Sequence, residues 1–261
     1  MVEMRMDGRC ALITGGSKGV GFAAAKNFIR SGAHVAIVAR REDVLAEARQ
    51  ELEKEGGGKI VTIAADISSA AGCASAFATA EKELGQVDVL LNNVGSHNAK
   101  PFETITDEQW EADLEVKLFA AIRLSRAAWP GMKSRKWGRI INTLSSGAKW
   151  PRVGSAPSSV TRAAGMALTK VMANDGAAHN ILVNAVIVGL LQTDQWVRAH
   201  AAENKGRSYE EYIDEMAQRI PMKRVGTAEE FANMMLFLAS DAGSYVTGTA
   251  INVDGGFCPV V

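Results

Sequence analysis

The chain has 261 residues, of which 47% are hydrophobic and 22% charged, as is typical of a globular protein with a large core. Its 29 basic residues balance its 29 acidic residues, so no overall field favours nucleic acid or a membrane, and neither is predicted as a partner. The three cysteines lie far apart, which argues against a disulfide framework and a metal site. No apolar run reaches the roughly 20 residues of a membrane span, and the N-terminus does not read as a signal peptide. We expect a cytoplasmic protein.

Short apolar runs alternate with segments of helical periodicity along the whole chain. Strands are predicted over residues 10–14, 33–39, 59–65, 87–92, 138–144, 181–187 and 249–253, and helices over residues 20–31, 42–54, 70–84, 107–129, 158–176 and 228–238. Each right-handed crossover between parallel strands must bury a helix against the sheet. The pattern therefore predicts an α/β fold with a single domain over residues 1–261, a Rossmann-type, doubly wound, parallel seven-stranded sheet.

Residues 190–224 interrupt this rhythm. The segment is polar, expected to be partly helical, and contains Tyr209, Tyr212 and Pro221. One interpretation is a solvated helical insertion, and the other is a mobile lid over the active site. We predict a helical lid on the substrate side.

A glycine-rich turn joins the first predicted strand to the first predicted helix. Glycine lets a pyrophosphate approach the backbone closely, and a helix N-terminus offers free amides and the positive end of a dipole. The alternative is a purely structural turn, but the strand-turn-helix context favours a dinucleotide. The residues predicted to hold it are Gly15, Ser17, Lys18, Gly19, Val20 and Gly21.

The end of the second strand indicates which dinucleotide is bound. A site that prefers NAD places an acid there on the adenosine ribose, whereas this chain has Arg40 and Arg41. Two guanidinium groups suit a 2′-phosphate, and Lys18 is a third cation in reach of it. The alternative is three solvated surface charges. We predict NADP(H) as the cofactor.

Further motifs follow in a fixed order: Thr14-Gly15-x-x-x-Gly19-x-Gly21, Asp66-Ile67, Asn92-Asn93-Val94-Gly95, Arg224-Val225-Gly226, Tyr245-Val246-Thr247-Gly248 and Val253-Asp254-Gly255-Gly256. With these motifs the chain resembles the classical short-chain dehydrogenase/reductase family over essentially its whole length, and is similar to reductases of the 3-oxoacyl carrier-protein type. The resemblance implies a small-molecule substrate and a homotetramer, or a dimer.

The resemblance also implies further contacts to the cofactor. Asp66 and Ile67 match the pair that contacts adenine, and Asn93, Val94 and Gly95 match the family's Asn-Ala-Gly with valine in place of alanine. Val188 and Gly189 stand where the family has Pro-Gly, and Thr193 matches the residue that bonds the nicotinamide side.

The catalytic pattern of the family is changed in this chain. Members of the family use a serine, a tyrosine and a lysine, helped by an asparagine in the preceding long helix. The aligned residues here are Ser145, Ser158, Arg162 and Lys117, so only the first serine is kept. A serine hydroxyl is a far poorer acid than a tyrosine, so proton delivery to an alkoxide needs another arrangement.

Arg162 has one predicted role, and Lys117, Ser145 and His97 have two interpretations each. Arg162 cannot act as a base but can stabilise an oxyanion. Lys117 beside a guanidinium can have a lowered pKa and donate a proton or clamp an anion, or it can simply snorkel out of its helix. Ser145 is either a donor to the substrate oxygen or a turn former, and His97 is either a proton carrier near the nicotinamide or a solvated loop residue.

Three functions remain open. The first is an NADP(H)-dependent oxidoreductase with atypical proton delivery that reduces a carbonyl, an imine or an activated double bond. The second is a catalytically impaired NADP(H)-binding subunit or regulator. The third is a non-redox enzyme on the same fold, dehalogenase-like or lyase-like, which the complete glycine motif disfavours. The substrate itself is not specified by any motif; Trp150 and Trp196 point to an apolar ligand or to core packing.

Overall fold

A computed structural model describes residues 4–95, 98–192, 194–203 and 206–261 of the chain. Its centre is a parallel seven-stranded sheet with the strand order β3-β2-β1-β4-β6-β8-β9, which confirms the predicted fold class. The strands of this sheet are β1 Cys10–Thr14, β2 His34–Ala39, β3 Ile60–Ala64, β4 Val89–Asn92, β6 Gly138–Ser145, β8 Ile181–Val188 and β9 Ala250–Val253.

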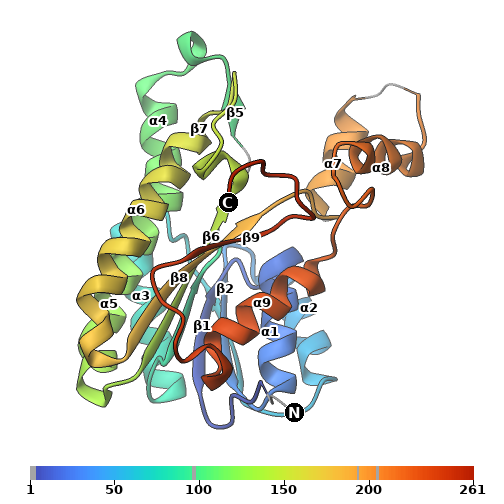
Figure 1. The fold of residues 1–261 in the computed structure, drawn as a ribbon. Coiled ribbons are helices and arrows are strands. Elements are labelled where there is room, and N and C mark those ends of the chain that lie inside the picture. The colour runs from blue at the N-terminus through green and yellow to red at the C-terminus, as the bar shows by residue number, and fades with distance from the viewer. Residues whose placement is uncertain (1–3, 96–97, 193, 204–205) are drawn as a thin grey trace.

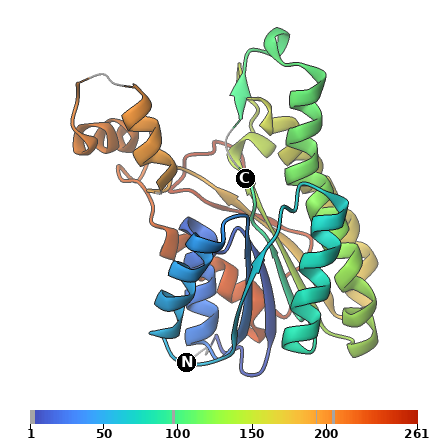
Figure 2. The same ribbon diagram turned by 180° about the vertical axis from the view of Figure 1, so that it is seen from behind.

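Helices cover both faces of the sheet (Figures 1 and 2). One face carries α1, α2 and α9, and the other carries α3, α5 and α6. The helices are α1 Gly19–Arg30, α2 Glu42–Glu53, α3 Ala70–Leu84, α4 Asp107–Leu114, α5 Ala120–Arg135, α6 Ser158–Gly176, α7 Asp194–Glu203, α8 Tyr209–Gln218 and α9 Ala228–Ala239.

Two layers of buried side chains hold the helices to the sheet. In the first layer, Phe28 of α1 and Phe231 of α9 are fully buried together with the residues of β1 and β2 that face them. In the second layer, Phe77 of α3 and Leu124 of α5 pack over β4 and β6. Both faces of each central strand are covered, which explains why these strands read as continuous apolar runs.

The strand order reverses between β1 and β4, which are neighbours although two strands separate them in the chain. In open α/β sheets, ligands bind in the crevice at the carboxyl ends of the strands beside such a switch point. Gly15 follows β1 and Asn93 follows β4, so both lie at this position.

The helix predicted over residues 107–129 is not one regular helix, and this prediction was wrong in two respects. A π-helical segment, Glu115–Phe119, separates α4 from α5. Helix α5 then continues past Pro130 to Arg135, because Ala128 before the proline and Met132 after it are both buried in the core. The core contacts thus outweigh the lost backbone hydrogen bond.

A second sheet consists of two short strands, β5 Ala99–Lys100 and β7 Ala156–Pro157, which pair antiparallel. No periodicity in the sequence predicted them. The pairing joins the loop after β4 to the residues that precede α6. It therefore brings together two segments that lie far apart in the chain, directly beside the start of α6.

The predicted lid segment forms α7 and α8, which stand apart from the sheet on the side of its carboxyl edge (Figure 1). A cluster of rings holds the two helices together: Tyr212 lies 5.9 Å from Trp196 and 5.6 Å from His200, measured between ring centroids. At the base of the pair, Gly226 donates its N–H to the Leu190 carbonyl. The two helices are thus one unit attached through a narrow base.

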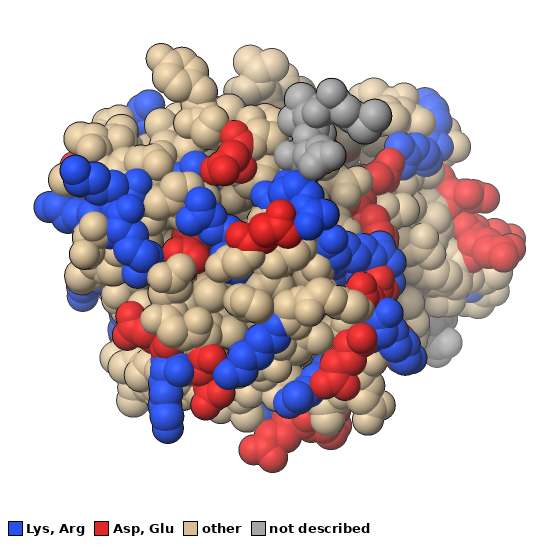
Figure 3. Space-filling model, turned by 90° about the horizontal axis from the view of Figure 1, so that it is seen from below, with Lys and Arg blue, Asp and Glu red and all other residues tan. Residues whose placement is uncertain are grey.

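The opposite, amino-terminal edge of the sheet carries acidic and basic side chains that are mixed over the surface (Figure 3). No helix among the described residues is long and apolar enough to cross a membrane. Within residues 4–95, 98–192, 194–203 and 206–261, no group of three metal-ligating side chains comes together.

Candidate active site

The turn between β1 and α1 leaves little space between its glycines. Gly19 adopts a φ of +56°, and a Cβ on Gly21 would lie 2.3 Å from the Gly15 carbonyl oxygen. The N-cap Lys18 makes no side-chain capping hydrogen bond, and the first turn of α1 holds no acidic residue. The N-terminal amides of α1 are therefore well suited to an anion such as a pyrophosphate.

The end of β4 is fastened to this turn by hydrogen bonds. Asn93 donates its N–H to Thr14 Oγ1 over 2.9 Å and its Nδ2 to the Thr14 carbonyl over 3.2 Å. Its Oδ1 accepts a hydrogen bond of 3.1 Å from Thr143 Oγ1. The ends of β1, β4 and β6 are thus held in fixed relation where Gly15, Asn93 and Val94 meet.

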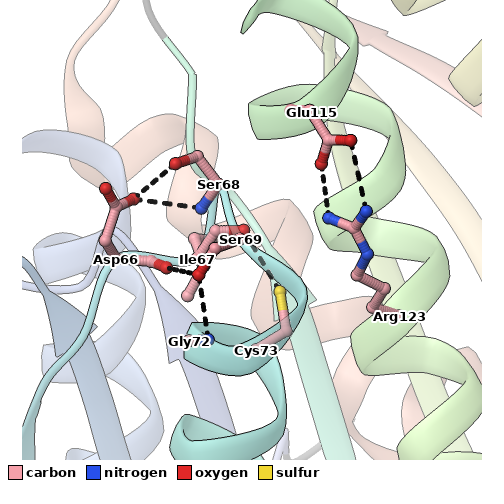
Figure 4. A network of polar contacts seen from close by, with 8 residues as sticks. All are labelled: Asp66, Ile67, Ser68, Ser69, Gly72, Cys73, Glu115 and Arg123. Carbon is pink, nitrogen blue, oxygen red and sulfur yellow. Dashed lines mark hydrogen bonds and ion pairs between the residues drawn. The ribbon is translucent and has the colours of Figure 1, made fainter.

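Asp66 lies after β3 with its carboxylate held by Ser68 (Figure 4). The Ser68 N–H and hydroxyl donate to Asp66 Oδ1 over 3.0 and 2.8 Å, and these bonds lower the pKa of the Asp66 carboxyl, with a smaller contribution from the charge of Arg40. The Cys73 thiol donates to the carbonyl of the buried Ile67. Arg40 and Arg41, at the end of β2, are exposed on this side. The structure therefore brings together the residues that the sequence predicted to bind the adenosine half of the cofactor.

Two of the remaining predicted cofactor contacts, Val188 and Gly189, lie at the end of β8. Val188 is the last residue of that strand, and a Cβ on Gly189 would lie 2.4 Å from Asp254 Cβ, so this glycine permits the close passage of the chain after β9. Ser17 and Val20 lie in the turn and in the first turn of α1. Thr193 and His97 lie outside the described residues.

Lys117 lies at the centre of the π-helical segment and points inward. Its side chain is 1% exposed, and its ammonium forms an ion pair with Asp113, whose side chain is 2% exposed. The interpretation of Lys117 as a lysine that snorkels to solvent is therefore wrong. Burial lowers the pKa of the Lys117 ammonium, an effect that Asp113 opposes and the charge of Arg162 reinforces. π-helical segments are often found at functional sites.

Ser158, the first residue of α6, is buried against this lysine. Lys117 Nζ donates to Ser158 Oγ over 2.5 Å, and the Asn98 N–H donates to the same oxygen over 3.0 Å. The Ser158 N–H in turn donates to the Asn98 carbonyl. Both lone pairs of the hydroxyl are thus engaged, so its own proton is left for another acceptor.

Arg162 lies one turn further along α6. Its Nη1 donates to the Thr143 carbonyl over 2.7 Å. A Cβ on Gly95 would lie 2.3 Å from Arg162 Nη2 and 3.3 Å from Lys117 Cγ, so all three residues meet at one point. Burial lowers the pKa of the Arg162 guanidinium to about 10, which leaves it protonated at neutral pH.

Ser145, which the alignment placed on the family's catalytic serine, ends β6 in register with Val188. Its hydroxyl bonds to none of the residues that the structure describes, unlike the hydroxyl of Ser158. Lys117, Thr14 and Asn92 are among the residues that line a cavity of about 10 Å³. This volume has room for about one water molecule.

Three residues that contact these groups were not identified from the sequence. Asp113 pairs with Lys117, Thr161 Oγ1 donates to Asp113 Oδ2 over 2.8 Å, and the Asn98 backbone holds Ser158. The four-residue spacing between Asp113 and Lys117 was a signal for an ion pair on one helix face. Nothing in the sequence marked Thr161 or Asn98.

A family model described as enoyl-(acyl carrier protein) reductase matches residues 15–258. Among curated relatives, the uncharacterised oxidoreductase YvrD of Bacillus subtilis is 36% identical and covers 98% of each chain. Acetoacetyl-CoA reductase of Shinella zoogloeoides is 34% identical over 95% of this chain and 98% of its own. The 3-oxoacyl-[acyl-carrier-protein] reductase of Aquifex aeolicus is 31% identical over 98% of this chain and 99% of its own.

Among solved structures, L-sorbose reductase from Gluconobacter frateurii, complexed with NADPH and L-sorbose, superposes with a TM-score of 0.96. It is 33% identical, and each chain is covered completely. The matches thus extend over the nucleotide turn, the sheet and the helices that carry Lys117 and Ser158. The chain belongs to the classical short-chain dehydrogenase/reductase family of oxidoreductases, as its motifs predicted.

Proposed function

We propose that the protein is an NADPH-dependent reductase of a small carbonyl compound in which Lys117, through Ser158, supplies the proton. The observation that carries this proposal is the 2.5 Å contact between Lys117 Nζ and Ser158 Oγ at the position of the family's tyrosine. When bound, NADPH supplies the hydride that reduces the carbonyl carbon. An imine or an activated double bond is reduced by the same chemistry.

The protein's part of the reaction is to neutralise the oxygen that becomes negative. Ser158 Oγ gives its proton to this oxygen and takes one from the Lys117 ammonium, so that no free serine alkoxide has to form. Serine alone is too weak an acid, but a lysine with a lowered pKa is a suitable proton source. A water molecule in the cavity lined by Lys117 would then relay a proton from solvent to the amine.

Arg162 and Ser145 assist without exchanging protons. The guanidinium stays charged, and its fixed bond to the Thr143 carbonyl directs the other nitrogens away from this carbonyl. A fixed positive charge beside the developing oxyanion lowers the barrier to reduction. Ser145, whose hydroxyl is available, donates a second hydrogen bond to the substrate oxygen.

The fit of the nucleotide turn supports NADP(H) as the cofactor. The pyrophosphate is held by the turn from Gly15 to Gly21, the 2′-phosphate by Arg40, Arg41 and Lys18, and the adenine by Asp66 and Ile67. Asn93, Val94, Gly95, Val188 and Gly189 border the nicotinamide half, and Thr193, outside the described residues, stays a contact predicted from the sequence.

Three further predictions from the sequence remain part of the proposal. Helices α7 and α8 act as the lid, which their narrow base permits. A homotetramer is supported by the exposed Val160 and Val171, which lie three turns apart on α6 and are 53% and 58% exposed. A cytoplasmic location agrees with these assignments.

The proposal is tested with stereospecifically deuterated NADPH and a panel of ketones, imines and enones. Deuterium is expected in the product, and Lys117→Met and Ser158→Ala are each expected to lower kcat by roughly 100-fold or more. Because Lys117→Met leaves a buried carboxylate unpaired, the double variant Asp113→Asn/Lys117→Met is measured beside it, with folding checked by circular dichroism.

Ser159→Ala is the matched control. Ser159 is buried next to Ser158, but its hydroxyl faces Gly147 and lies outside the Lys117 contacts. It should retain full activity. If NADPH binds tightly but no substrate gains deuterium, the protein is a cofactor-binding subunit rather than an enzyme. If NADPH does not bind, a non-redox enzyme remains.

A further inference from the structure

Two arginines lie against one aromatic ring beside the carboxyl edge of the sheet. The guanidinium carbon of Arg152 is 5.2 Å, and that of Arg219 is 6.0 Å, from the centre of the Phe257 ring. Arg152 also lies 5.0 Å from the Trp150 ring, which packs edge-on against Phe257. We call Arg152, Arg219 and Phe257 the arginine pair and its platform.

Unlike several other arginines of the chain, these two have no acidic partner among the described residues. Arg123, Arg135 and Arg224 each form an ion pair with a carboxylate. No carboxylate of the described residues lies within ion-pair distance of Arg152 or Arg219, and both side chains are exposed. Arg219 Nη1 donates to the Met216 sulfur over 3.3 Å. The remaining N–H groups of the two guanidinium groups can still bind a carboxylate or a phosphate.

The platform is fixed from two sides. Asp254 accepts hydrogen bonds from the N–H groups of Gly256 and Cys258, which shape the loop that buries the Phe257 ring. Lys149 Nζ donates to the Ala250 carbonyl and to Asn252 Oδ1, so the loop that carries Trp150 and Arg152 is attached to β9. The aromatic ring beside the two guanidinium groups is therefore held in place.

The platform follows β9, whose end lies two strands away from Ser145. Ser145, Val188 and Val253 lie in register on the adjacent strands β6, β8 and β9. Two strand spacings put Ser145 roughly 10 Å from the end of β9, four residues before Phe257. Figure 1 shows the C-terminal segment crossing the carboxyl edge between β7 and the base of α7.

We infer that the substrate carries an anionic group, a carboxylate or a phosphate, which the arginine pair binds while its carbonyl group reaches Ser158. The inference rests on the proposed function. Arg219 follows the last turn of α8, so the same contact joins the anion to the end of the proposed lid. The arginines bind the substrate and take no part in proton transfer.

The test compares substrates that differ in one charge. A graded series of methyl-ketone carboxylic acids is measured against the methyl esters, and dihydroxyacetone phosphate against dihydroxyacetone, so that the two kinds of anion are separated. At least one anion is expected to have a KM roughly tenfold below that of its neutral partner. Arg152→Gln/Arg219→Gln should raise that KM to the neutral value without changing kcat, because it removes uniform binding.

Arg126→Gln is the matched control, since Arg126 is an exposed arginine on α5, away from this edge. Equal KM values for every anion and its neutral partner, or an unchanged KM in the double variant, would overturn the inference. If no ketone is reduced at all, the proposed function fails separately. Calorimetric titration of the NADP⁺-loaded protein with the same acids then tests the arginine pair alone. Binding that is lost in the double variant supports the inference, and equal binding in the double variant and the wild type overturns it.

Discussion

The nucleotide turn and the proposed proton-transfer site lie near each other at the carboxyl edge of the sheet but are built in opposite ways. The turn around Gly15 and Gly21 is made of backbone and retains the family pattern. The site around Lys117, Ser158 and Arg162 is made of side chains, and all three differ from the family pattern. Thr143 links the two, because its hydroxyl bonds to Asn93 and its carbonyl to Arg162.

The contacts among the three residues support our proposal that the replacements form a set rather than a series of losses. Lys117 and Ser158, two of the replaced residues, are in direct contact. Asp113 balances the buried ammonium. An isolated loss of catalytic residues would leave buried polar groups without partners, whereas here Lys117 binds Asp113 and Ser158, and the Ser158 oxygen accepts two hydrogen bonds.

The largest effect is expected from a single methyl group in the turn. Gly21→Ala places a Cβ 2.3 Å from a carbonyl oxygen of the backbone, which cannot move without shifting β1. We expect NADPH binding to weaken roughly 100-fold, from about 3 kcal/mol of overpacking. Cofactor fluorescence measures it. Gly131→Ala, where the new Cβ meets only the flexible end of Arg135, is the control, and equal weakening there would contradict the reason given.

The second test separates the two regions by comparing how kcat and the affinity for NADPH depend on pH. A proton source with a lowered pKa must be protonated to act, so kcat should be constant at low pH and fall about tenfold per unit above a midpoint that lies below 10.5, the ordinary value for lysine. The affinity for NADPH should not change at this midpoint. Steady-state kinetics over the pH range, with Asp113→Asn in parallel, measure it. Since Asp113 raises the Lys117 pKa, that variant should move the midpoint down; an unmoved midpoint would assign the titration to another group.

The smallest of the three effects is expected at the 2′-phosphate. Arg40→Asp removes a charge-assisted hydrogen bond, which should weaken NADPH binding about tenfold and improve NADH binding. The ratio of the two dissociation constants measures the shift. Arg49→Asp on the exposed face of α2 is the charge-matched control, because Arg49 pairs with Glu53 away from the turn. The same NADPH affinity in Arg40→Asp and the wild type would exclude the phosphate role of Arg40.

The features with a period or a fixed spacing could be predicted from the sequence. The seven strands, the glycine turn and the positions of Ser145, Ser158 and Arg162 were all predicted, because each depends on local pattern or on an ordered motif. The alignment also identified Lys117, but not its partner. Asp113 has the same spacing as many surface pairs, and only the fold shows that both side chains are buried.

What could not be predicted depends on contacts between distant segments. The pairing of Ala99 with Pro157 places the Asn98 backbone on Ser158, and two residues on each side are too few to produce a periodicity. The continuation of α5 beyond Pro130 depends on the burial of Met132, which is a tertiary effect. The arginine pair and its platform likewise come from three segments that lie far apart in the chain.

The π-helical segment Glu115–Phe119 has a consequence for how this site can change. One extra residue in a turn offsets the helical phase before the segment from the phase after it by a fixed angle. The buried face of α5, with Leu124 and Met132, can therefore stay in the core while the residues before it rotate toward α6. Deletion of one residue from the segment would restore regular winding and turn Asp113 by about 100° around the helix axis relative to α5. The proton-transfer site thus depends on the length of this helix as much as on the residues within it.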